Sequence, residues 1–268
     1  MKLIDTHIHV WNLDQVDYPW LKGDTSILNR NYALEELEAG RVRAGVTAGV
    51  LVQAANSLAD TEWMLGVAGA NEWITGVVGW VPLEDPVETG SLLEEGWKGN
   101  GVRHLIHNEA DAAWLLREPV LESLGLLAAR DIPYDVVGVV PAHIRTALKV
   151  AERWPGLRMV FDHLNQPPGV GVAGSEWEEL MKEAARHANF YCKISGLGEG
   201  NRERGIRFAL THFGPDRCFC GGDWPVSLLR DNYEQTWTAY RRIIEQYTDE
   251  VAREKVFWEN AERFYRLH

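Results

Sequence analysis

The stretch Leu3-Ile4-Asp5-Thr6-His7-Ile8-His9-Val10-Trp11 decides how the rest of this sequence is interpreted. It is a strand-like apolar run that ends in two histidines one residue apart. Because side chains alternate between the two faces of a strand, His7 and His9 are expected on the same side, one pleat apart. Two imidazoles in that arrangement suit a divalent metal, or a substrate held by neutral polar groups. For an isolated His-x-His pair the alternative is one buried structural histidine and one at the surface.

The composition is that of a globular protein with one large domain over residues 1–268, of which 46% are hydrophobic and 25% charged. The net charge of −12 argues against nucleic acid or an anionic membrane surface as a partner, but leaves a small anionic substrate open. Three cysteines do not form a disulfide framework and suit a reducing compartment. Without a signal-peptide pattern or a membrane-spanning apolar run, we expect a cytoplasmic protein. The oligomeric state is left open, with a homo-oligomer as one alternative.

Strand-like and helical segments alternate along the whole chain. The irregular stretch 12–31 after the first strand contains Tyr18-Pro19-Trp20 and is long enough to be a binding loop. The further expected strands are 46–53, 74–81, 101–107, 132–137, 157–162, 190–194 and 217–221. The expected helices are 33–43, 61–72, 84–97, 115–130, 141–154, 175–187, 202–213, 232–247 and 249–267. This alternation predicts an α/β fold, a single (β/α)8 TIM barrel with an additional C-terminal helix. A doubly wound open sheet is the alternative, but no glycine-rich phosphate loop follows the first strand.

Active sites of such barrels lie at the carboxyl ends of the strands. The polar side chains expected there are His7, His9, Arg103, His107, His163, Lys193 and Asp223. Several have a structural alternative: Lys193 as a surface residue at a strand edge, His163 as a cap, and Asp223 as a turn residue in Gly-Gly-Asp-Trp-Pro. The remaining histidines are expected to be structural or surface residues: His104, His143, His187, His212 and His268.

Several further motifs, in a fixed order, resemble those of one known group of proteins. They are Ile4-Asp5-Thr6-His7-Ile8-His9-Val10-Trp11, Tyr18-Pro19-Trp20-Leu21, Gly101-Val102-Arg103-His104, Trp114-Leu115-Leu116, Asp162-His163-Leu164, Tyr191-Cys192-Lys193-Ile194-Ser195-Gly196-Leu197, Gly222-Asp223-Trp224-Pro225-Val226 and Asn260-Ala261-Glu262-Arg263-Phe264-Tyr265. The chain resembles the lactonase branch of the amidohydrolase superfamily, in the amidohydrolase 2 group. That branch holds sugar-lactone (fucono- and rhamnono-lactone) and 2-pyrone-4,6-dicarboxylate lactone hydrolases.

The resemblance implies a distorted (β/α)8 barrel in which His7, His9, His163 and Asp223 form the catalytic cluster. Two departures from the family pattern bear on the substrate. Asn165-Gln166 stands where Gly-Lys is common, and His107 stands where Gln is common.

The metal content is left open. Superfamily members with two metals bridge them through a carboxylated lysine on the fourth strand, and residues 101–107 contain no lysine. The choice is therefore one divalent metal, zinc or manganese, or none. The four side chains of the cluster form an acceptable zinc set with room for a water. Without a metal, the histidines could hydrogen-bond the substrate carbonyl as an oxyanion forms.

The expected reaction is hydrolysis of a small lactone by attack of water on the ring carbonyl. Asp223 takes the proton from the water and delivers it to the ring oxygen, while the three histidines polarise the carbonyl with or without a metal. The residues expected to hold or enclose the substrate are Arg103, His107, Lys193, Trp11, Trp20 and Trp224. Sugar aldono-lactones are preferred over lactones of aromatic ring-cleavage products. The alternatives are a metal-dependent decarboxylase of an aromatic acid and a non-catalytic small-molecule binder on the same scaffold.

Overall fold

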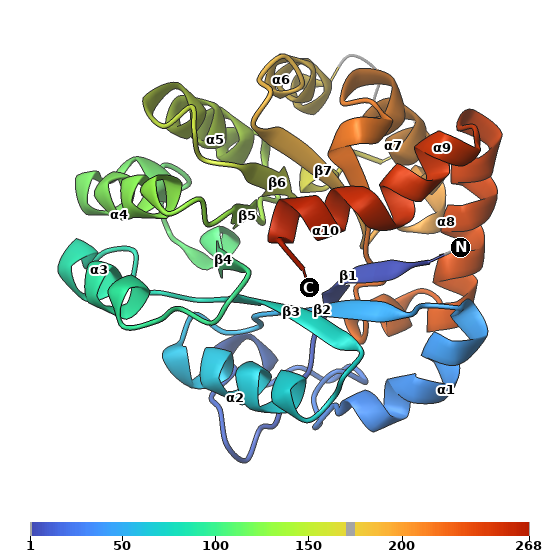
Figure 1. Ribbon diagram of the computed structural model, residues 1–268, viewed down its shortest axis with the longest axis horizontal. Coiled ribbons are helices and arrows are strands. Elements are labelled where there is room, and N and C mark those ends of the chain that lie inside the picture. Colours follow the sequence, from blue (N-terminus) through green and yellow to red (C-terminus); the bar gives the residue numbers. More distant parts are fainter. Residues whose placement is uncertain (1, 170–174, 268) are drawn as a thin grey trace.

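The computed structural model describes residues 2–169 and 175–267, and its centre is a ring of parallel strands (Figure 1). The strands are β1 Ile4–Ile8, β2 Ala48–Val52, β3 Ile74–Gly79, β4 Gly101–His104, β5 Tyr134–Val136, β6 Met159–Phe161, β7 Phe190–Ile194 and β8 Cys218–Cys220. Each strand pairs with the next one in chain order. The predicted (β/α)8 barrel is therefore confirmed.

The ring closes through the segment that follows β8 rather than through β8 itself. Ile8 forms a parallel bridge with Trp224. The amide of Asp223 donates to the carbonyl of His7 at 2.8 Å, and the amide of His9 donates to the carbonyl of Trp224 at 2.7 Å. This closure ties the loop after β8 to the two histidines at the end of β1.

Helices follow the strands and surround the barrel (Figure 1). They are α1 Leu34–Ala44, α2 Leu58–Gly69, α3 Pro86–Glu94, α4 Glu118–Ala129, α5 Pro141–Arg153, α6 Glu176–Ala184, α7 Glu199–His212 and α8 Tyr233–Tyr247. The expected C-terminal helix is present but divided into α9 Glu250–Glu254, a π-helical turn Lys255–Glu259 and α10 Asn260–Tyr265. No helix among residues 2–169 and 175–267 is long and apolar enough to span a bilayer.

Local sequence signals explain where several helices begin. Asp85 caps α3 by accepting from two backbone amides, and Pro86 follows as its first residue. Ser175 caps α6, as the sequence predicts, by accepting from the amide of Glu178. Pro141 stands at the first position of α5, where its missing N–H costs no hydrogen bond.

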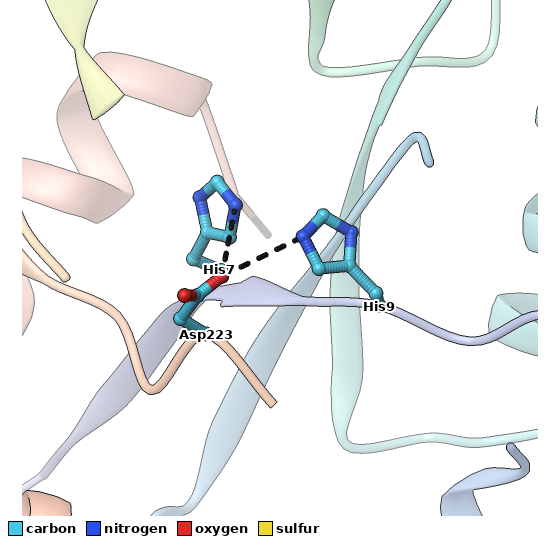
Figure 2. A group of neighbouring side chains, drawn as sticks. All are labelled: His7, His9 and Asp223. Atoms are coloured by element: carbon cyan, nitrogen blue, oxygen red, sulfur yellow. Dashed lines mark ion pairs between the residues drawn. The ribbon is translucent and has the colours of Figure 1, made fainter. Parts of the chain in front are cut away.

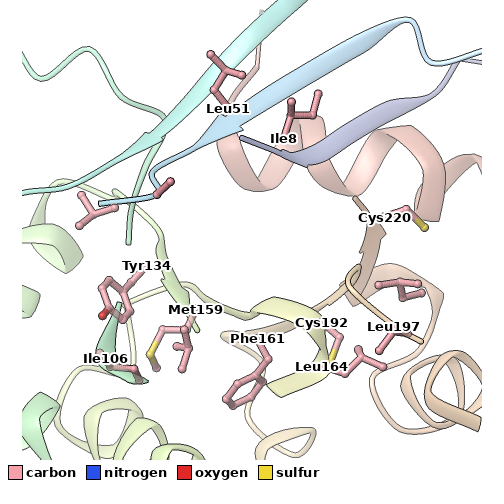
Figure 3. Packing of buried hydrophobic residues seen from close by; sticks show 14 of the residues in the cluster. Ile8, Leu51, Ile106, Tyr134, Met159, Phe161, Leu164, Cys192, Leu197 and Cys220 are labelled. Atoms are coloured by element: carbon pink, nitrogen blue, oxygen red, sulfur yellow. The ribbon is translucent and has the colours of Figure 1, made fainter. Parts of the chain in front are cut away.

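Strand alternation separates two apolar layers. Ile8, Leu51, Phe161 and Cys192 point outward and pack against the helices (Figure 3). A second cluster, which includes Val50 of β2 and Phe219 of β8, fills the barrel interior together with side chains of α10. Because Ile8 points outward, its neighbours His7 and His9 point into the barrel, as the period-two pattern predicts.

The fourth strand is shorter than expected. It ends at His104 because the amide of Leu105 donates to the Asn56 side chain at 2.8 Å instead of pairing with a strand. His107 consequently lies on a 3₁₀ turn, Ile106–Asn108. His104 itself stacks on Trp114 with ring centroids 3.9 Å apart, in the structural role expected of it. His268 lies outside the described residues.

Candidate active site

Four buried side chains from three strand ends converge at the carboxyl end of the barrel (Figure 2 draws three of them). His7 and His9 come from β1, His163 follows β6, and Asp223 follows β8. One carboxylate oxygen, Oδ1 of Asp223, lies 3.8 Å from Nε2 of His7, 3.7 Å from Nε2 of His9 and 3.8 Å from Nε2 of His163. The structure thus brings together the cluster of residues predicted to be catalytic and metal-binding.

Asp223 is placed by the Gly-Gly-Asp turn after β8. Asp5 accepts hydrogen bonds from the amide of Gly222 at 2.7 Å and from the Tyr233 hydroxyl at 2.7 Å. A Cβ at Gly222 would lie 2.5 Å from Oδ2 of Asp5, so only glycine allows this approach. Asp223 itself has a φ of 56°, a left-handed conformation that aspartate tolerates better than most residues. The Gly-Gly-Asp turn therefore serves to place the carboxylate of Asp223 in the cluster.

His163 is placed by an unusual left-handed turn. Four consecutive non-glycine residues, His163 to Gln166, have φ values of 54°, 51°, 52° and 55°. Left-handed backbone costs roughly 1–2 kcal/mol per residue, so this turn is held by its surroundings. The Nδ1 atom of His163 lies 2.8 Å from the hydroxyl of Ser195, which directs Nε2 toward Asp223.

Burial favours the neutral form of the three imidazoles. Burial lowers the pKa of His7 and His9 well below the usual value, and lowers the pKa of His163 to about 4. Nδ1 of His9 lies 2.7 Å from the carbonyl of Val52, an acceptor only, so we assign its proton to Nδ1 and a lone pair to Nε2. Burial also raises the pKa of Asp223 to about 7, against the opposing charges of Arg230 and Arg103.

The donor set fits one divalent cation. Ligand atoms of His7, His9 and Asp223 all lie within 4.8 Å of one another. A tetrahedral zinc site with bonds of about 2.0–2.1 Å has ligand atoms roughly 3.3 Å apart, so separations of 3.7–3.8 Å are slightly expanded from that arrangement. The lone pairs of the histidine nitrogens face the carboxylate oxygen of Asp223 and repel it. A cation bound between these atoms would remove the repulsion, which is why the donor set suits a metal ion.

Asp162 is a buried residue beside the cluster that sequence reasoning did not select. Its carboxylate lies 3.0 Å from Nη1 of Arg103, 2.8 Å from Nζ of Lys193 and 3.6 Å from Nδ1 of His7. Burial alone would raise the pKa of Asp162, but the charge of Lys193, the adjacent His7 ring and the charge of Arg103 hold it well below its usual range. The signal available in the sequence was an acid that directly precedes His163 at the end of an apolar strand.

A cavity of about 240 Å³ opens above the cluster. Its lining includes His9, Arg103, His107, His163, Gln166, Asp223, Trp20 and Arg230. Three residues predicted to hold the substrate are not part of that lining: Lys193, Trp11 and Trp224. A larger cavity of about 640 Å³ lies between the loop after β1, α1 and α2, and includes none of the predicted site residues.

The three residues outside the cavity have other contacts. Lys193 is fully buried and ion-paired to acids inside the barrel. Trp11 lies behind Trp20, with ring centroids 5.3 Å apart and the rings perpendicular. Trp224 packs edge-on against Tyr32 at 5.4 Å.

Arg230 is a second residue that the sequence interpretation missed. It follows the 3₁₀ turn Val226–Leu229, and its Nη1 donates to the carbonyl of Gly196 at 2.9 Å. None of the ion pairs found among residues 2–169 and 175–267 includes Arg230, although its guanidinium lines the cavity. An arginine in an irregular loop has no strand periodicity, so no sequence pattern pointed to it.

Comparison with known proteins identifies the family. The amidohydrolase family profile matches residues 4–267. The L-fucono-1,5-lactonase of Burkholderia ambifaria is 33% identical over 98% of this chain and 95% of its own length. A solved amidohydrolase from Burkholderia multivorans with bound zinc is 27% identical over 100% of both chains, with a TM-score of 0.91. A 2,6-dihydroxybenzoate decarboxylase from Rhizobium is 14% identical over 99% of this chain and 98% of its own, with a TM-score of 0.68, and shares the fold. The chain belongs to the amidohydrolase family.

Proposed function

We propose that this protein hydrolyses a sugar aldono-lactone, such as L-fucono-lactone, to the open-chain hydroxy acid. The observation that carries the proposal is the convergence of three neutral imidazole Nε2 atoms on Oδ1 of Asp223 at one end of a cavity of about 240 Å³. The relative from Burkholderia ambifaria supports the sugar-lactone class, because its similarity extends over nearly the whole chain. The more distant decarboxylase shares only the fold and gives no support to the alternative reaction.

One divalent ion would be held by His7, His9, His163 and Asp223, whose donor atoms suit zinc or manganese. The zinc-bound relative supports zinc. When bound, the ion supplies a Lewis acid that polarises the lactone carbonyl and makes water a better nucleophile. The histidines contribute lone pairs that burial keeps unprotonated.

Asp223 is proposed as the residue that moves the proton. Its carboxylate accepts a proton from the attacking water as the water oxygen bonds to the carbonyl carbon. When the ring C–O bond breaks, Asp223 returns that proton to the leaving ring oxygen, and the product is the hydroxy acid. Burial makes the Asp223 carboxylate more basic than an exposed aspartate, which favours it as the proton acceptor.

The cavity walls offer specific contacts for a polyhydroxylated ring. Nδ1 of His107 lies 3.3 Å from the carbonyl of Val137, which leaves Nε2 for a substrate hydroxyl. The indole N–H of Trp20 donates to the carbonyl of Ala54 at 2.8 Å, and the ring is left to pack on a sugar face. Arg103 and Gln166 line the same cavity, and Trp11 supports Trp20 from behind.

Arg230 is proposed to bind the carboxylate that hydrolysis creates. Its guanidinium lines the cavity beside Asp223, and its hydrogen bond to the Gly196 carbonyl uses one of five N–H donors. A planar guanidinium matches a carboxylate better than it matches a neutral lactone. The contact therefore strengthens as the reaction proceeds.

The test is turnover of a panel of aldono-lactones and dicarboxylate lactones by the purified protein supplied with zinc, followed with a pH indicator. We expect a sugar lactone to be opened, with one oxygen of ¹⁸O-labelled water in the product carboxylate. Release of CO2 from 2,6-dihydroxybenzoate, with no lactone opened, would replace this proposal by the decarboxylase alternative.

A further inference from the structure

A column of buried charged groups extends from the cluster toward the other end of the barrel. Nζ of Lys193 on β7 lies 2.5 Å from Oδ2 of Asp135 on β5 and 2.8 Å from Oδ1 of Asp162 after β6. Asp135 accepts a hydrogen bond from the Tyr265 hydroxyl of α10 at 2.8 Å, and Asp162 accepts from Nη1 of Arg103 at 3.0 Å. The two acids and two cations balance each other, and each is at most 3% exposed.

Such a column requires an explanation, because buried ion pairs are not an efficient way to stabilise a fold. Removing charges from water costs several kcal/mol per ion, and apolar side chains of similar volume often serve as well. The barrel interior already holds an apolar layer that includes Val160, Phe219 and Phe264. A role beyond packing is therefore the better account of four charges placed there.

His7 lies at the end of the column that is next to the cluster. Nε2 of His7 lies 3.3 Å from Nη1 of Arg103, a group that can only donate. We therefore assign a lone pair to Nε2 and the ring proton to Nδ1. Nδ1 in turn lies 3.6 Å from Oδ1 of Asp162 and 3.4 Å from Nζ of Lys193. The 3.6 Å separation from Asp162 is an ion-pair distance rather than a hydrogen bond, and the negative charge of that carboxylate favours the ring proton on Nδ1.

We propose that Lys193 is a positioning residue for His7. Lys193, which Asp135 holds on its other side, fixes the carboxylate of Asp162 beside Nδ1 of His7, where the negative charge favours the ring proton on Nδ1 and leaves the lone pair on Nε2. Lys193 does not touch the substrate, because it is fully buried and the cavity lining does not include it. This proposal rests on the proposed function in one respect: the Nε2 atom of His7 is the atom that would bind the metal ion.

The experiment compares the wild type with two variants, Lys193→Met and the charge-balanced pair Asp135→Asn with Lys193→Met. The single variant leaves two acids against one cation in the barrel and is at risk of not folding, whereas the paired variant retains Asp162 with Arg103. Arg158→Met is the matched control, since it removes a partly buried cation that is ion-paired with Asp131 at 2.7 Å, away from the cluster.

The first readout is the tautomer of His7 in metal-free protein, measured from ring ¹⁵N shifts in long-range ¹H–¹⁵N spectra. The wild type and Arg158→Met are expected to show the Nδ1–H form, and the paired variant a mixture of tautomers. The second readout is zinc affinity by competition with a chromophoric chelator, expected to weaken about 10- to 100-fold in the paired variant. With a lactone substrate, kcat is expected to fall by a similar factor while KM stays within about threefold.

An unchanged His7 tautomer together with unchanged zinc affinity in the paired variant would overturn the proposal. A large rise in KM at unchanged kcat would also overturn it, because that result is expected of a substrate contact. If the wild type opens no lactone, the proposed function fails, but the tautomer and zinc readouts still decide the role of Lys193.

Discussion

Gly196, which follows β7, offers a perturbation whose size can be worked out from the structure. Its φ of 58° is left-handed, and a Cβ added there would lie 2.5 Å from Nδ1 of His163 and 3.0 Å from Oδ2 of Asp223. For Gly196→Ala, the His163 ring must retreat by about 0.5 Å to reach the closest contact that side chains show, and by about 0.9 Å to reach an ordinary one. The substitution therefore moves a residue of the cluster without changing its chemistry.

The expected loss of activity follows from that displacement. A misplacement of about 1 Å at a reacting centre can cost roughly 100-fold in rate, so we expect kcat/KM on the preferred lactone to fall about 10- to 100-fold. This corresponds to roughly 1.4–2.7 kcal/mol of transition-state stabilisation. The left-handed backbone adds a stability cost of about 1–2 kcal/mol, which a thermal melt would detect.

Gly214→Ala separates the two effects. Gly214 has a φ of 76° and a ψ of 164°, a conformation that only glycine readily adopts, and a Cβ there has nothing within 4 Å, so this variant carries a backbone cost of about 1–3 kcal/mol without the clash. Both variants are expected to melt a few degrees below wild type, and only Gly196→Ala is expected to lose activity. If the two variants have the same kcat/KM, the placement of His163 by Gly196 is not important for turnover, and the geometric reasoning about the cluster is refuted.

Three other substitutions test single residues of the site. Asp223→Asn removes the proton acceptor and should lower kcat about 10²- to 10⁴-fold; retained turnover would reassign the proton transfer. Arg230→Met should raise the inhibition constant of the hydroxy-acid product about 10-fold or more, since a hydrogen bond to a charged group is worth about 1.5–3 kcal/mol, while KM for a neutral lactone changes little. A product inhibition constant equal to that of wild type would exclude this contact. Trp20→Ala should raise KM for sugar lactones about 3- to 10-fold through lost ring packing, with kcat nearly unchanged, and steady-state kinetics would show whether it does so.

The sequence predicted the fold because the same alternation recurs in most strands, although β1 departs from it between Asp5 and Ile8, where its pairing with β2 shifts register. Side chains alternate with a period of two, so Ile8 packs against helices while His7 and His9 face the barrel. The same rule placed Lys193 inside the barrel, but it could not predict how deep the ammonium group lies. The depth depends on acids from other strands, and Asp135, on β5, is 58 residues away from Lys193 in the chain.

The rest of the site depends on loop geometry that no periodicity encodes. Arg230 lines the cavity because a hydrogen bond to the carbonyl of Gly196 holds its side chain there. Gln166 lines the cavity because it ends a run of four consecutive left-handed residues. The end of β4 depends on the side chain of Asn56, which takes the amide of Leu105 away from the strand ladder. Contacts of this kind are properties of the folded chain rather than of any short stretch of sequence.

We propose that His7, His9, His163 and Asp223 open a lactone with one divalent metal. The most direct test is kcat/KM for L-fucono-lactone on three samples of the same protein: as purified, after chelation, and after one equivalent of zinc is returned. We predict that chelation abolishes turnover and that one equivalent of zinc restores it, with metal analysis giving one ion per chain. Full turnover by protein shown to contain no metal would contradict the claim and leave the histidines to polarise the carbonyl alone.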